Sequence, residues 1–426
     1  MESDRKTLIT MLAFAGDFIC WGVGMTFAGQ TTVMPTFVRH FTDSPILIGL
    51  VSTIQMGGFL LPQLLVSNLI AHRERKKPFM LAVGLFYRPI FWLLALFLVV
   101  SRGQDGALIL TVFYLLFTAF NLGDAVATVP WFDIMGKSVP PSRRGRMMGS
   151  AQIIMGLLAI GAGQVVKAIL SPDGPGFPFN YALCFAIAGT GAMVAWGWEL
   201  FIYEAIQPVS ENRLPLREYL PVLWRVLRHD ANFTRLTAVR LLAGMANMAL
   251  PFYIIFATDQ LKFPPESVGL FVSAQVAGTV LAGSVLGFLS ERSGSRAVII
   301  ASLTLQTLAP ALALFLFFTG LTSGAFAPWL YAVVFVAIGV GQSSGILGFI
   351  NYVLELAPPQ ERVTYVGLTN TLSGVLLIAP LVGALLIDYF SFTGMFVVVL
   401  AVLVGSLLMS MRLIEPRGMY GDYKVA

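Results

Sequence analysis

Long apolar segments separated by short polar loops make up most of the chain. A helix needs about 20 consecutive apolar residues to cross a bilayer, and twelve segments come close to that length or exceed it. The segments cover residues 11–38, 47–71, 79–100, 107–132, 147–170, 180–203, 234–258, 267–290, 297–319, 328–354, 363–388 and 393–413. This pattern predicts an all-α membrane protein with twelve transmembrane helices, whose two termini lie on the same side of the bilayer.

The loops on the two sides of the predicted membrane differ strongly in basic residues. Of the 27 Lys and Arg residues, 21 fall in loops on one side and four in loops on the other. Short loops rich in Lys and Arg stay in the cytoplasm. We therefore expect a multi-pass protein of the plasma membrane (the inner membrane in a bacterium) with both termini in the cytoplasm.

The chain repeats itself at a period of about 220 residues. Ile48-Gly49-Leu50, at the start of the second predicted helix, recurs as Val268-Gly269-Leu270 at the start of the eighth. A Pro-Pro pair before the fifth helix likewise recurs before the eleventh, at residues 140–141 and 358–359. Six helices separate the copies, and because six is even, both copies cross the membrane in the same direction. Parallel repeats of this kind are related by an axis along the membrane normal.

The repeat predicts the domain organisation. It consists of an N-terminal six-helix half at 1–203, a cytoplasmic linker at 204–233, a C-terminal six-helix half at 234–413 and a cytoplasmic tail at 414–426. The linker contains leucines at helical spacing, flanked by arginines, within residues 216–228. Such an amphipathic stretch is typical of a helix that lies on the membrane surface.

The loop between the eighth and ninth helices carries a motif that resembles a family signature. Gly287-x-x-x-Glu291-Arg292-x-Gly294-x-Arg296 is similar to Gly-x-x-x-Asp-Arg-x-Gly-x-Arg-Arg of the major facilitator superfamily, with Glu in place of Asp. The first-half copy at residues 68–77 is degenerate. The resemblance covers essentially the whole chain. It implies a secondary active transporter, a symporter or an antiporter, that carries a small solute by alternating access between two halves.

Composition agrees with the membrane class. The chain is 57% hydrophobic and only 12% charged, with a mean hydropathy of +0.80, whereas soluble domains carry about 25% charged residues. Its pI near 9.2 reflects the basic loops, so no nucleic-acid partner is expected. Cys20 and Cys184 lie in apolar segments, and the three histidines lie far apart in sequence. We expect no metal, no cofactor and a monomer in the lipid bilayer.

Four ionisable residues stand out inside the predicted helices: Asp17, Arg88, Asp124 and Arg240. Each costs about 2.5–3.5 kcal/mol to insert, so each is a candidate for substrate binding or proton coupling. We expect Asp124, with or without Asp17, to be the proton-coupling carboxyl group, because burial favours its neutral form. Arg88 or Arg240 would hold an anionic group of the substrate. Alternatively, Arg88 and Asp124 form a purely structural pair.

Polar or small residues also recur at helical spacing on the first, fourth and seventh helices, and Gln342 and Ser343 lie on the tenth. The family resemblance implies that these four helices line a central cavity. The expected lining residues are Thr31, Tyr114, Asn121, Thr128, Asn247, Gln342 and Ser343.

Charged residues in the predicted cytoplasmic loops form a candidate gate. We expect acidic residues of one half to meet basic residues of the other and so to bias two states of similar energy. The set comprises Arg73, Arg75, Lys77, Arg143, Arg144, Arg146, Glu291, Arg292, Arg296, Glu355, Glu361 and Arg362. Alternatively, these charges only fix the orientation of the helices in the membrane.

Enzyme motifs are missing from the sequence. It has no phosphate-binding Walker loop and no dinucleotide-binding glycine turn. Gly341–Gly345 matches G-x-S-x-G, but it lies within an apolar helix, where small residues serve close packing. We therefore expect a carrier and not an enzyme. A transport-inactive receptor or scaffold of the same fold is the alternative, and the charges inside the helices favour the carrier.

Overall fold

The computed structural model describes residues 2–70, 73–205, 228, 230–321, 324, 326–357 and 362–416. The linker helix expected within 204–233 falls almost entirely outside the described residues. By their contacts, the helices form two compact units. The first comprises Met1–Ser210 and Ile254–Ser273, and the second comprises Glu211–Tyr253 and Ala274–Ala426.

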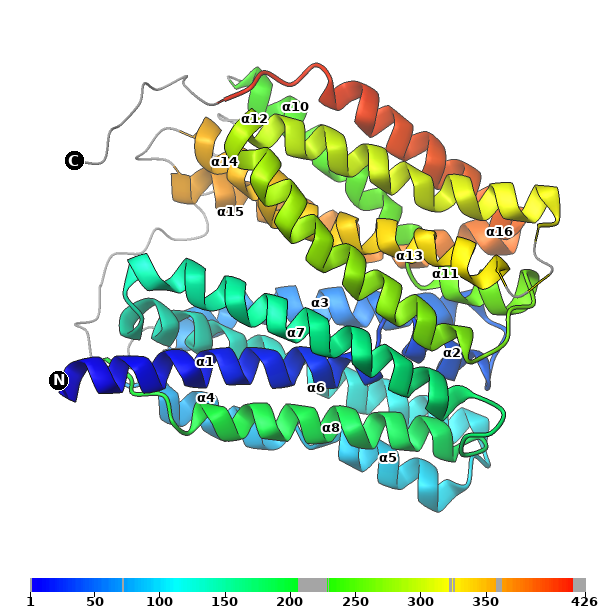
Figure 1. Ribbon diagram of the computed structural model, residues 1–426, viewed down its shortest axis with the longest axis horizontal. Coiled ribbons are helices and arrows are strands. Elements are labelled where there is room, and N and C mark those ends of the chain that lie inside the picture. The colour runs from blue at the N-terminus through cyan, green and yellow to red at the C-terminus, as the bar shows by residue number, and fades with distance from the viewer. Residues whose placement is uncertain are drawn as a thin grey trace. The chain divides into compact units, whose positions relative to one another are not determined.

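The helices of residues 1–210 come from the first predicted half of the chain (Figure 1). They are α1 (Glu2–Phe27), α2 (Val33–Arg39), α3 (Pro45–Ile70), α4 (Lys77–Tyr87), α5 (Ile90–Ser101), α6 (Gly106–Ser138), α7 (Pro141–Leu170) and α8 (Phe179–Glu199). Together, α4 and α5 form one membrane-crossing helix that breaks at Arg88-Pro89. The break follows from Pro89, which has no N–H to donate and whose ring crowds the preceding turn.

The remaining helices follow the linker. They are α10 (Ala231–Gly244), η1 (Met245–Ala249), α11 (Phe252–Ile255), η2 (Phe256–Gln260), α12 (Ser267–Thr319), α13 (Ala327–Ser344), η3 (Gly345–Ile350), α14 (Asn351–Leu356), α15 (Arg362–Ser373), η4 (Gly374–Ile378) and α16 (Ala379–Ser410). Two of them contain a turn: α12 at Gly294, with φ 83°, and α16 at Ser391, with φ 64°. Each therefore contributes two crossings joined by a tight connection.

The predicted all-α fold with twelve crossings is confirmed. Among the described residues, ten helices are long and apolar enough to span a membrane, and the last of these, Leu368–Ser410, divides at Ser391. The helix α3 supplies the remaining crossing.

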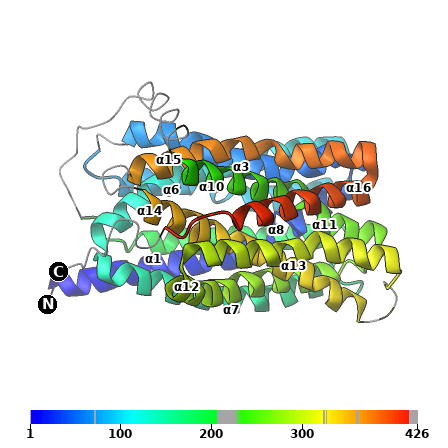
Figure 2. The same ribbon diagram turned by 90° about the horizontal axis from the view of Figure 1, so that it is seen from above.

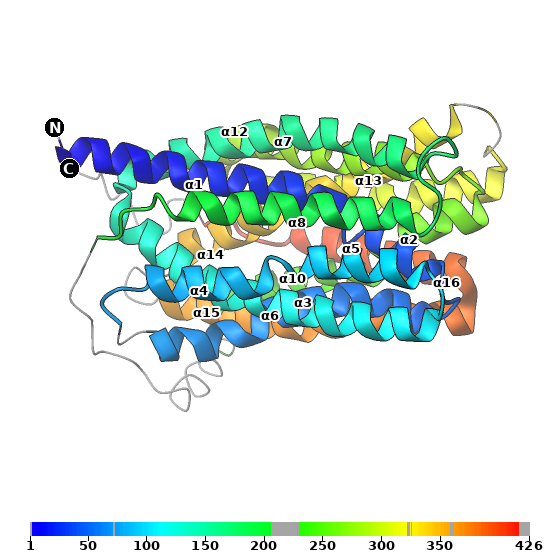
Figure 3. The ribbon, with the colours of Figure 1, turned by 90° about the horizontal axis from the view of Figure 1, so that it is seen from below.

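Small residues set the packing of both units. In the first unit α1 packs against α7 and α8 (Figure 3), and a Cβ added to Gly24 would lie 3.0 Å from the Cα of Gly191. In the second unit α10 packs against α15 and α16 (Figure 2), and a Cβ on Gly383 would lie 2.1 Å from the carbonyl oxygen of Met248. Glycine at these positions lets helix backbones approach closely, as is typical inside membranes.

The segment 254–273 clusters with the first unit, although the sequence places it in the second half. Its contacts with the first unit include two hydrogen bonds. Arg39 Nε donates to Asp259 Oδ2 at 2.5 Å, and Ser273 Oγ donates to the carbonyl oxygen of Ile160 at 2.9 Å.

In both repeats, a glutamate that follows the last crossing accepts hydrogen bonds from the backbone of the loop after the second crossing. Glu204, just beyond α8, accepts hydrogen bonds from the backbone N–H groups of Lys76 and Lys77 at 2.7 and 3.0 Å. Glu415, beyond α16, accepts from the backbone N–H of Arg296 at 3.2 Å. In each repeat the end of the last helix is thereby tied to the loop after the second helix, so the sequence repeat extends to this contact. We call the pair the Glu204 and Glu415 closures.

Candidate functional site

A buried arginine lies inside the first unit. Arg88 is only 4% exposed. Its Nη1 lies 3.3 Å from Asp17 Oδ1, and its Nη2 donates to Glu199 Oε1 at 2.5 Å. Nη1 also donates to the carbonyl oxygen of Ala192 at 2.9 Å. The guanidinium therefore joins α1 and α8 at the break between α4 and α5.

The helix break positions this side chain. The N–H of Arg88 makes the last hydrogen bond of α4, to the carbonyl oxygen of Gly84 at 3.1 Å. Gly84 has no side chain, and a Cβ there would lie 3.7 Å from Arg88 Nε and 2.6 Å from the Trp196 ring. Pro89, which has no N–H to donate, then ends the series of backbone hydrogen bonds. The absence of a side chain at Gly84 thus leaves room beside α8 for both Trp196 and the arginine.

The hydrogen-bond network continues beyond the ion pairs. Arg88 Nε donates to Tyr87 Oη at 3.2 Å, and Tyr87 Oη donates to Asp124 Oδ1 at 3.3 Å. At the other end, Trp131 Nε1 donates to Asp17 Oδ2 at 2.7 Å. Both Asp124 and Trp131 come from α6, so the network joins three carboxyl groups from three helices through one cation and one hydroxyl group.

Aromatic rings enclose the guanidinium. Arg88 Cζ lies 5.0 Å from the centroid of the Trp21 ring and 5.7 Å from that of Tyr87. The Trp21 ring stacks on Phe120 with centroids 5.7 Å apart. Cation–π contacts of this kind gain strength when water is excluded. The rings therefore favour a charged arginine and keep its surroundings apolar.

The charges in this cluster do not balance when every group is ionised. Three carboxyl groups, those of Asp17, Asp124 and Glu199, share the single positive charge of Arg88. Full ionisation would leave an excess of two negative charges, and an uncompensated buried charge is very costly. In the described part of the chain, Glu199 Oε2 is buried with no hydrogen-bond partner. The arrangement therefore favours at least one protonated carboxyl group and can take up and release protons.

The structure brings together three of the four predicted intramembrane residues, with one correction. The direct Arg88–Asp124 pair does not form, because Tyr87 lies between them and Asp17 and Glu199 pair with the arginine instead. Sequence reasoning missed Glu199. The available signal was an acidic residue within the apolar segment 180–203, and its position near the predicted helix end concealed it.

The fourth residue, Arg240, belongs to the second unit and has different surroundings. It lies on α10, and its Nη2 is 3.5 Å from Asn370 Oδ1 of α15. Its Cζ lies 6.0 Å from the centroid of the Phe349 ring in η3. Within the described residues, Nη1 is buried and has no hydrogen-bond partner.

Several expected cavity residues use their polar groups within a helix bundle. Asn121 Nδ2 donates to the carbonyl oxygen of Phe117 at 2.7 Å, Tyr114 Oη donates to that of Leu47, and Ser343 Oγ donates to that of Thr279 at 3.1 Å. These contacts support a packing role. Thr31 is buried, Thr128 and Asn247 are half-buried, and Gln342 is exposed. A cavity-lining role stays a prediction for all seven residues.

Some of the expected gate residues have partners within their own unit. Lys77 Nζ donates to the carbonyl oxygens of Leu200 and Ile202 at 2.8 and 2.7 Å. Glu355 Oε2 accepts from Ser295 Oγ at 2.5 Å. Other gate residues contact a carbonyl or a ring, or are exposed: Arg144, Arg296, Arg73, Arg75, Arg143, Arg146 and Arg292.

Glu361 and the side chains of Glu291 and Arg362 fall outside the described residues. The expected ion pairs between the halves stay a prediction.

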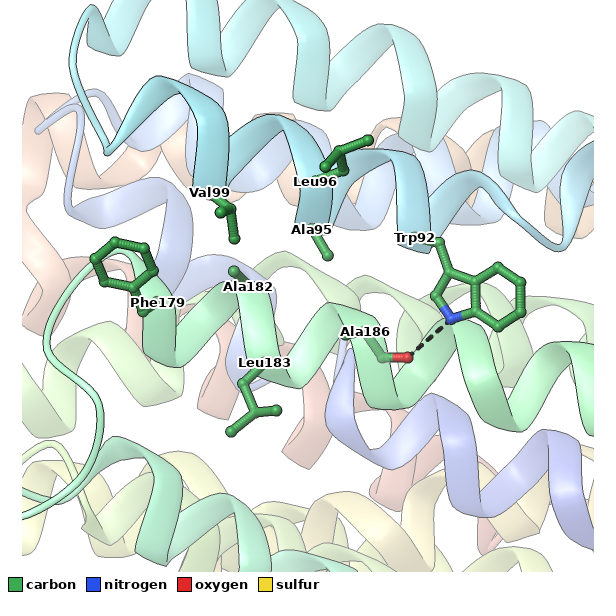
Figure 4. Close-up of a pocket in the computed structure, with 8 residues that line it drawn as sticks. All are labelled: Trp92, Ala95, Leu96, Val99, Phe179, Ala182, Leu183 and Ala186. Carbon is green, nitrogen blue, oxygen red and sulfur yellow. Dashed lines mark hydrogen bonds between the residues drawn. The ribbon is translucent and has the colours of Figure 1, made fainter.

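An apolar groove lies between α5 and α8 (Figure 4). Its lining residues are Trp92, Ala95, Leu96, Val99, Phe179, Ala182, Leu183 and Ala186. The one side-chain polar group among them, Trp92 Nε1, already donates to the carbonyl oxygen of Ala186 at 3.1 Å. The groove therefore offers no free polar group to orient a polar solute, and the charged cluster is the better candidate site.

Sequence comparisons identify related proteins. A family model described as "Major Facilitator Superfamily" matches residues 16–257 and 236–422. A putative sugar efflux transporter of Deinococcus radiodurans is 29% identical over 165 residues, which are 38% of this chain and 41% of that protein. A D-xylose transporter of Levilactobacillus brevis is 26% identical over 160 residues, 37% of this chain and 31% of that protein. Each alignment spans less than half of the curated relative.

Solved structures share the fold over nearly the whole chain. A D-xylose–proton symporter matches with a TM-score of 0.68 at 12% identity, covering 97% of this chain and 98% of that one. A bacterial homolog of the human lysosomal transporter Spinster matches with a TM-score of 0.64 at 15% identity and the same coverage of both chains. At these identities the likeness shows the fold alone.

Proposed function

The chain belongs to the Major Facilitator Superfamily of membrane transporters, and from this premise we propose that it carries a small solute by proton-coupled alternating access. The observation that carries the proposal is the buried cluster in which three carboxyl groups share one arginine. Its excess of carboxyl groups supplies a place for at least one transferable proton. Two relatives described as sugar transporters support the carrier role, and a D-xylose–proton symporter of the same fold supports the proton coupling.

Glu199 is the proposed proton-exchange residue. It is the last residue of α8, and its unbonded Oε2 can hold a proton while Oε1 faces Arg88. Protonation removes the charge that ties α8 to the helix break, and it leaves Arg88 paired with Asp17. The positive-inside bias supports a location of this end of α8 near the cytoplasm, and proton exchange would then occur with that side.

Asp124 is the proposed second proton-coupling residue. It is reached through the hydroxyl group of Tyr87, which accepts from Arg88 and donates to the carboxyl group. When one carboxyl group loses its proton, the single positive charge of Arg88 has a further negative charge to offset. Loss of a proton from the next carboxyl group is therefore less favourable. The three carboxyl groups thus act as one coupled unit.

The buried carboxyl groups favour a carrier over the alternative of a transport-inactive receptor or scaffold. A receptor needs no proton reservoir within its first helix bundle, and charged groups inside a membrane are costly to keep. We also propose that both termini lie in the cytoplasm, on the evidence of the basic loops.

Proton movement in proteoliposomes tests the proposal. The purified protein would be reconstituted with a pH-sensitive dye in the lumen, and a panel of sugars and organic anions would be added outside. We expect at least one solute to move protons in the wild type, and Glu199→Gln to carry that solute without proton movement. Asp388→Asn is the matched control, because Asp388 is an exposed acid on α16. Unchanged proton movement in Glu199→Gln would contradict the role of Glu199.

A further inference from the structure

Arg240 is an intramembrane cation without an acidic partner in the described part of the chain. The contrast with Arg88 is direct, because Arg88 faces two carboxylates at 3.3 and 2.5 Å. Among the described residues, the hydrogen-bond partner of Arg240 is a neutral amide oxygen, that of Asn370, at the long distance of 3.5 Å. Its Nη1 is buried and makes no hydrogen bond with the described residues.

A charge of this kind is costly inside a membrane helix unless something neutralises it. The guanidinium keeps its charge at any physiological pH and presents a planar fork of donors, which matches the paired oxygens of a carboxylate or phosphate. Asn370 adds an amide Nδ2 that can donate to the same group. The Phe349 ring, 6.0 Å from Arg240 Cζ, provides an apolar wall.

The three helices that carry these residues change their winding close to the site. Four residues after Arg240, α10 ends at Gly244 and continues as the 3₁₀ segment η1. Phe349 lies within the π-helical η3, and α15 passes into the 3₁₀ segment η4 four residues after Asn370. Such segments inside long helices mark hinges and functional sites. Irregular backbone at membrane depth also indicates a wet cavity or protein-buried surroundings.

We propose that the carried solute is a small organic anion whose carboxylate or phosphate group binds Arg240, with Asn370 as a second donor. This inference rests on the proposed transport function and adds the substrate class. It also separates two tasks between the units. The Arg88 cluster holds protons and already has its counter-charges, whereas Arg240 takes its counter-charge from the solute. A neutral sugar such as D-xylose could not neutralise Arg240.

Ligand-induced thermal stabilisation of the full-length protein in detergent tests this inference, because a ligand that binds the folded state raises its apparent stability. The probes are D-gluconate for a carboxylate, glucose 6-phosphate for a phosphate and D-xylose for a neutral sugar, all at one ionic strength. We expect one of the anionic probes to raise the unfolding midpoint and D-xylose to leave it unchanged. The probe that acts identifies which anionic group the site takes.

Four variants sharpen the test. Arg240→Gln should weaken the apparent affinity for the active probe at least tenfold, and Arg240→Lys, which keeps the charge but loses the fork, should weaken it less. Arg235→Gln is the matched control, because Arg235 is exposed on the same helix. Asn370→Asp would place a carboxylate beside Nη2, so it should raise the midpoint without ligand and abolish the response to the anion.

The outcomes separate this inference from the proposed function. If no anionic probe stabilises the wild type, or if Arg235→Gln loses the response as Arg240→Gln does, the inference is overturned. If D-xylose moves with protons in liposomes and Arg240→Gln carries it equally well, the inference fails while proton-coupled transport stands. If Arg240-dependent anion binding is found but no protons move with the anion, the inference stands and proton coupling fails.

Discussion

Replacement of Arg88 by glutamine gives the sharpest test of the charge argument. The substitution removes the one cation that faces Asp17 at 3.3 Å and Glu199 at 2.5 Å. Removing one partner of a buried ion pair costs about 3–5 kcal/mol, because the remaining charge is stranded. The variant can lower this cost only by binding protons at the stranded carboxyl groups.

Proton binding gives the variant a pH dependence of known sign. Near neutral pH the unfolded chain has ionised Asp and Glu side chains, whereas the folded variant holds extra protons. Because the folded state then binds more protons, stability falls as pH rises, by about 1.4 kcal/mol per pH unit for each extra proton. Arg88→Gln should therefore approach the wild type at pH 5 and fall far below it at pH 8.

Thermal unfolding in detergent from pH 5 to pH 8 would measure this effect. The double variant Arg88→Gln, Glu199→Gln is the matched control, because it strands one fewer carboxyl group and should have a shallower pH dependence. Glu199→Gln alone should cost less than Arg88→Gln, since Arg88 keeps Asp17 as its partner. If Arg88→Gln shows the same pH profile as the wild type, the reasoning about excess carboxyl groups is refuted.

Three further predictions follow from contacts described above. Trp131→Phe removes the 2.7 Å hydrogen bond to Asp17. It should cost about 1 kcal/mol of stability, measured as a lower unfolding midpoint. It should also shift the pH profile of proton movement in liposomes. Gly191→Val should overpack the contact with α1, because a Cβ at this position would lie 2.6 Å from the Cα of Gly24. The expected cost is about 1–3 kcal/mol, which thermal unfolding would detect. Gly294→Ala should lower the unfolding midpoint by more than a Gly→Ala change at an exposed position. Its φ of 83° disfavours a side chain, and a Cβ would lie 2.4 Å from the Glu415 carboxyl carbon. Equal midpoints for the two variants would contradict this prediction.

Much of the fold was predictable because the bilayer imposes a simple rule on the sequence. Long apolar segments predicted the twelve crossings that the structure contains. Boundaries were less predictable. The turn at Ser391 falls between the predicted segments 363–388 and 393–413, as expected. The changes of winding in η1, η3 and η4 have no strong local signal, because they depend on packing between helices.

The site was predictable only in part. Asp17, Arg88 and Asp124 were proposed because charges inside apolar segments stand out, but the alternative of a direct Arg88–Asp124 pair does not occur in the structure, where Tyr87 lies between them. Whether Arg88 meets Asp124 or Glu199 depends on the rotation of α6 and α8 about their axes, and hydrophobic pattern fixes that rotation poorly when helices are apolar on every side. Glu199 lay near a predicted helix end, where an acid usually reaches water.

The Glu204 and Glu415 closures have a consequence for how the molecule can be assembled. In each six-helix bundle, a glutamate that follows the last helix accepts hydrogen bonds from the backbone after the second helix of the same bundle. A polypeptide cut between residues 206 and 229 would leave both sets of hydrogen bonds intact. The two pieces, made separately in one cell, should each fold in the membrane and associate. A cut before Glu204 should instead remove the contact that holds the end of α8 to Lys76 and Lys77.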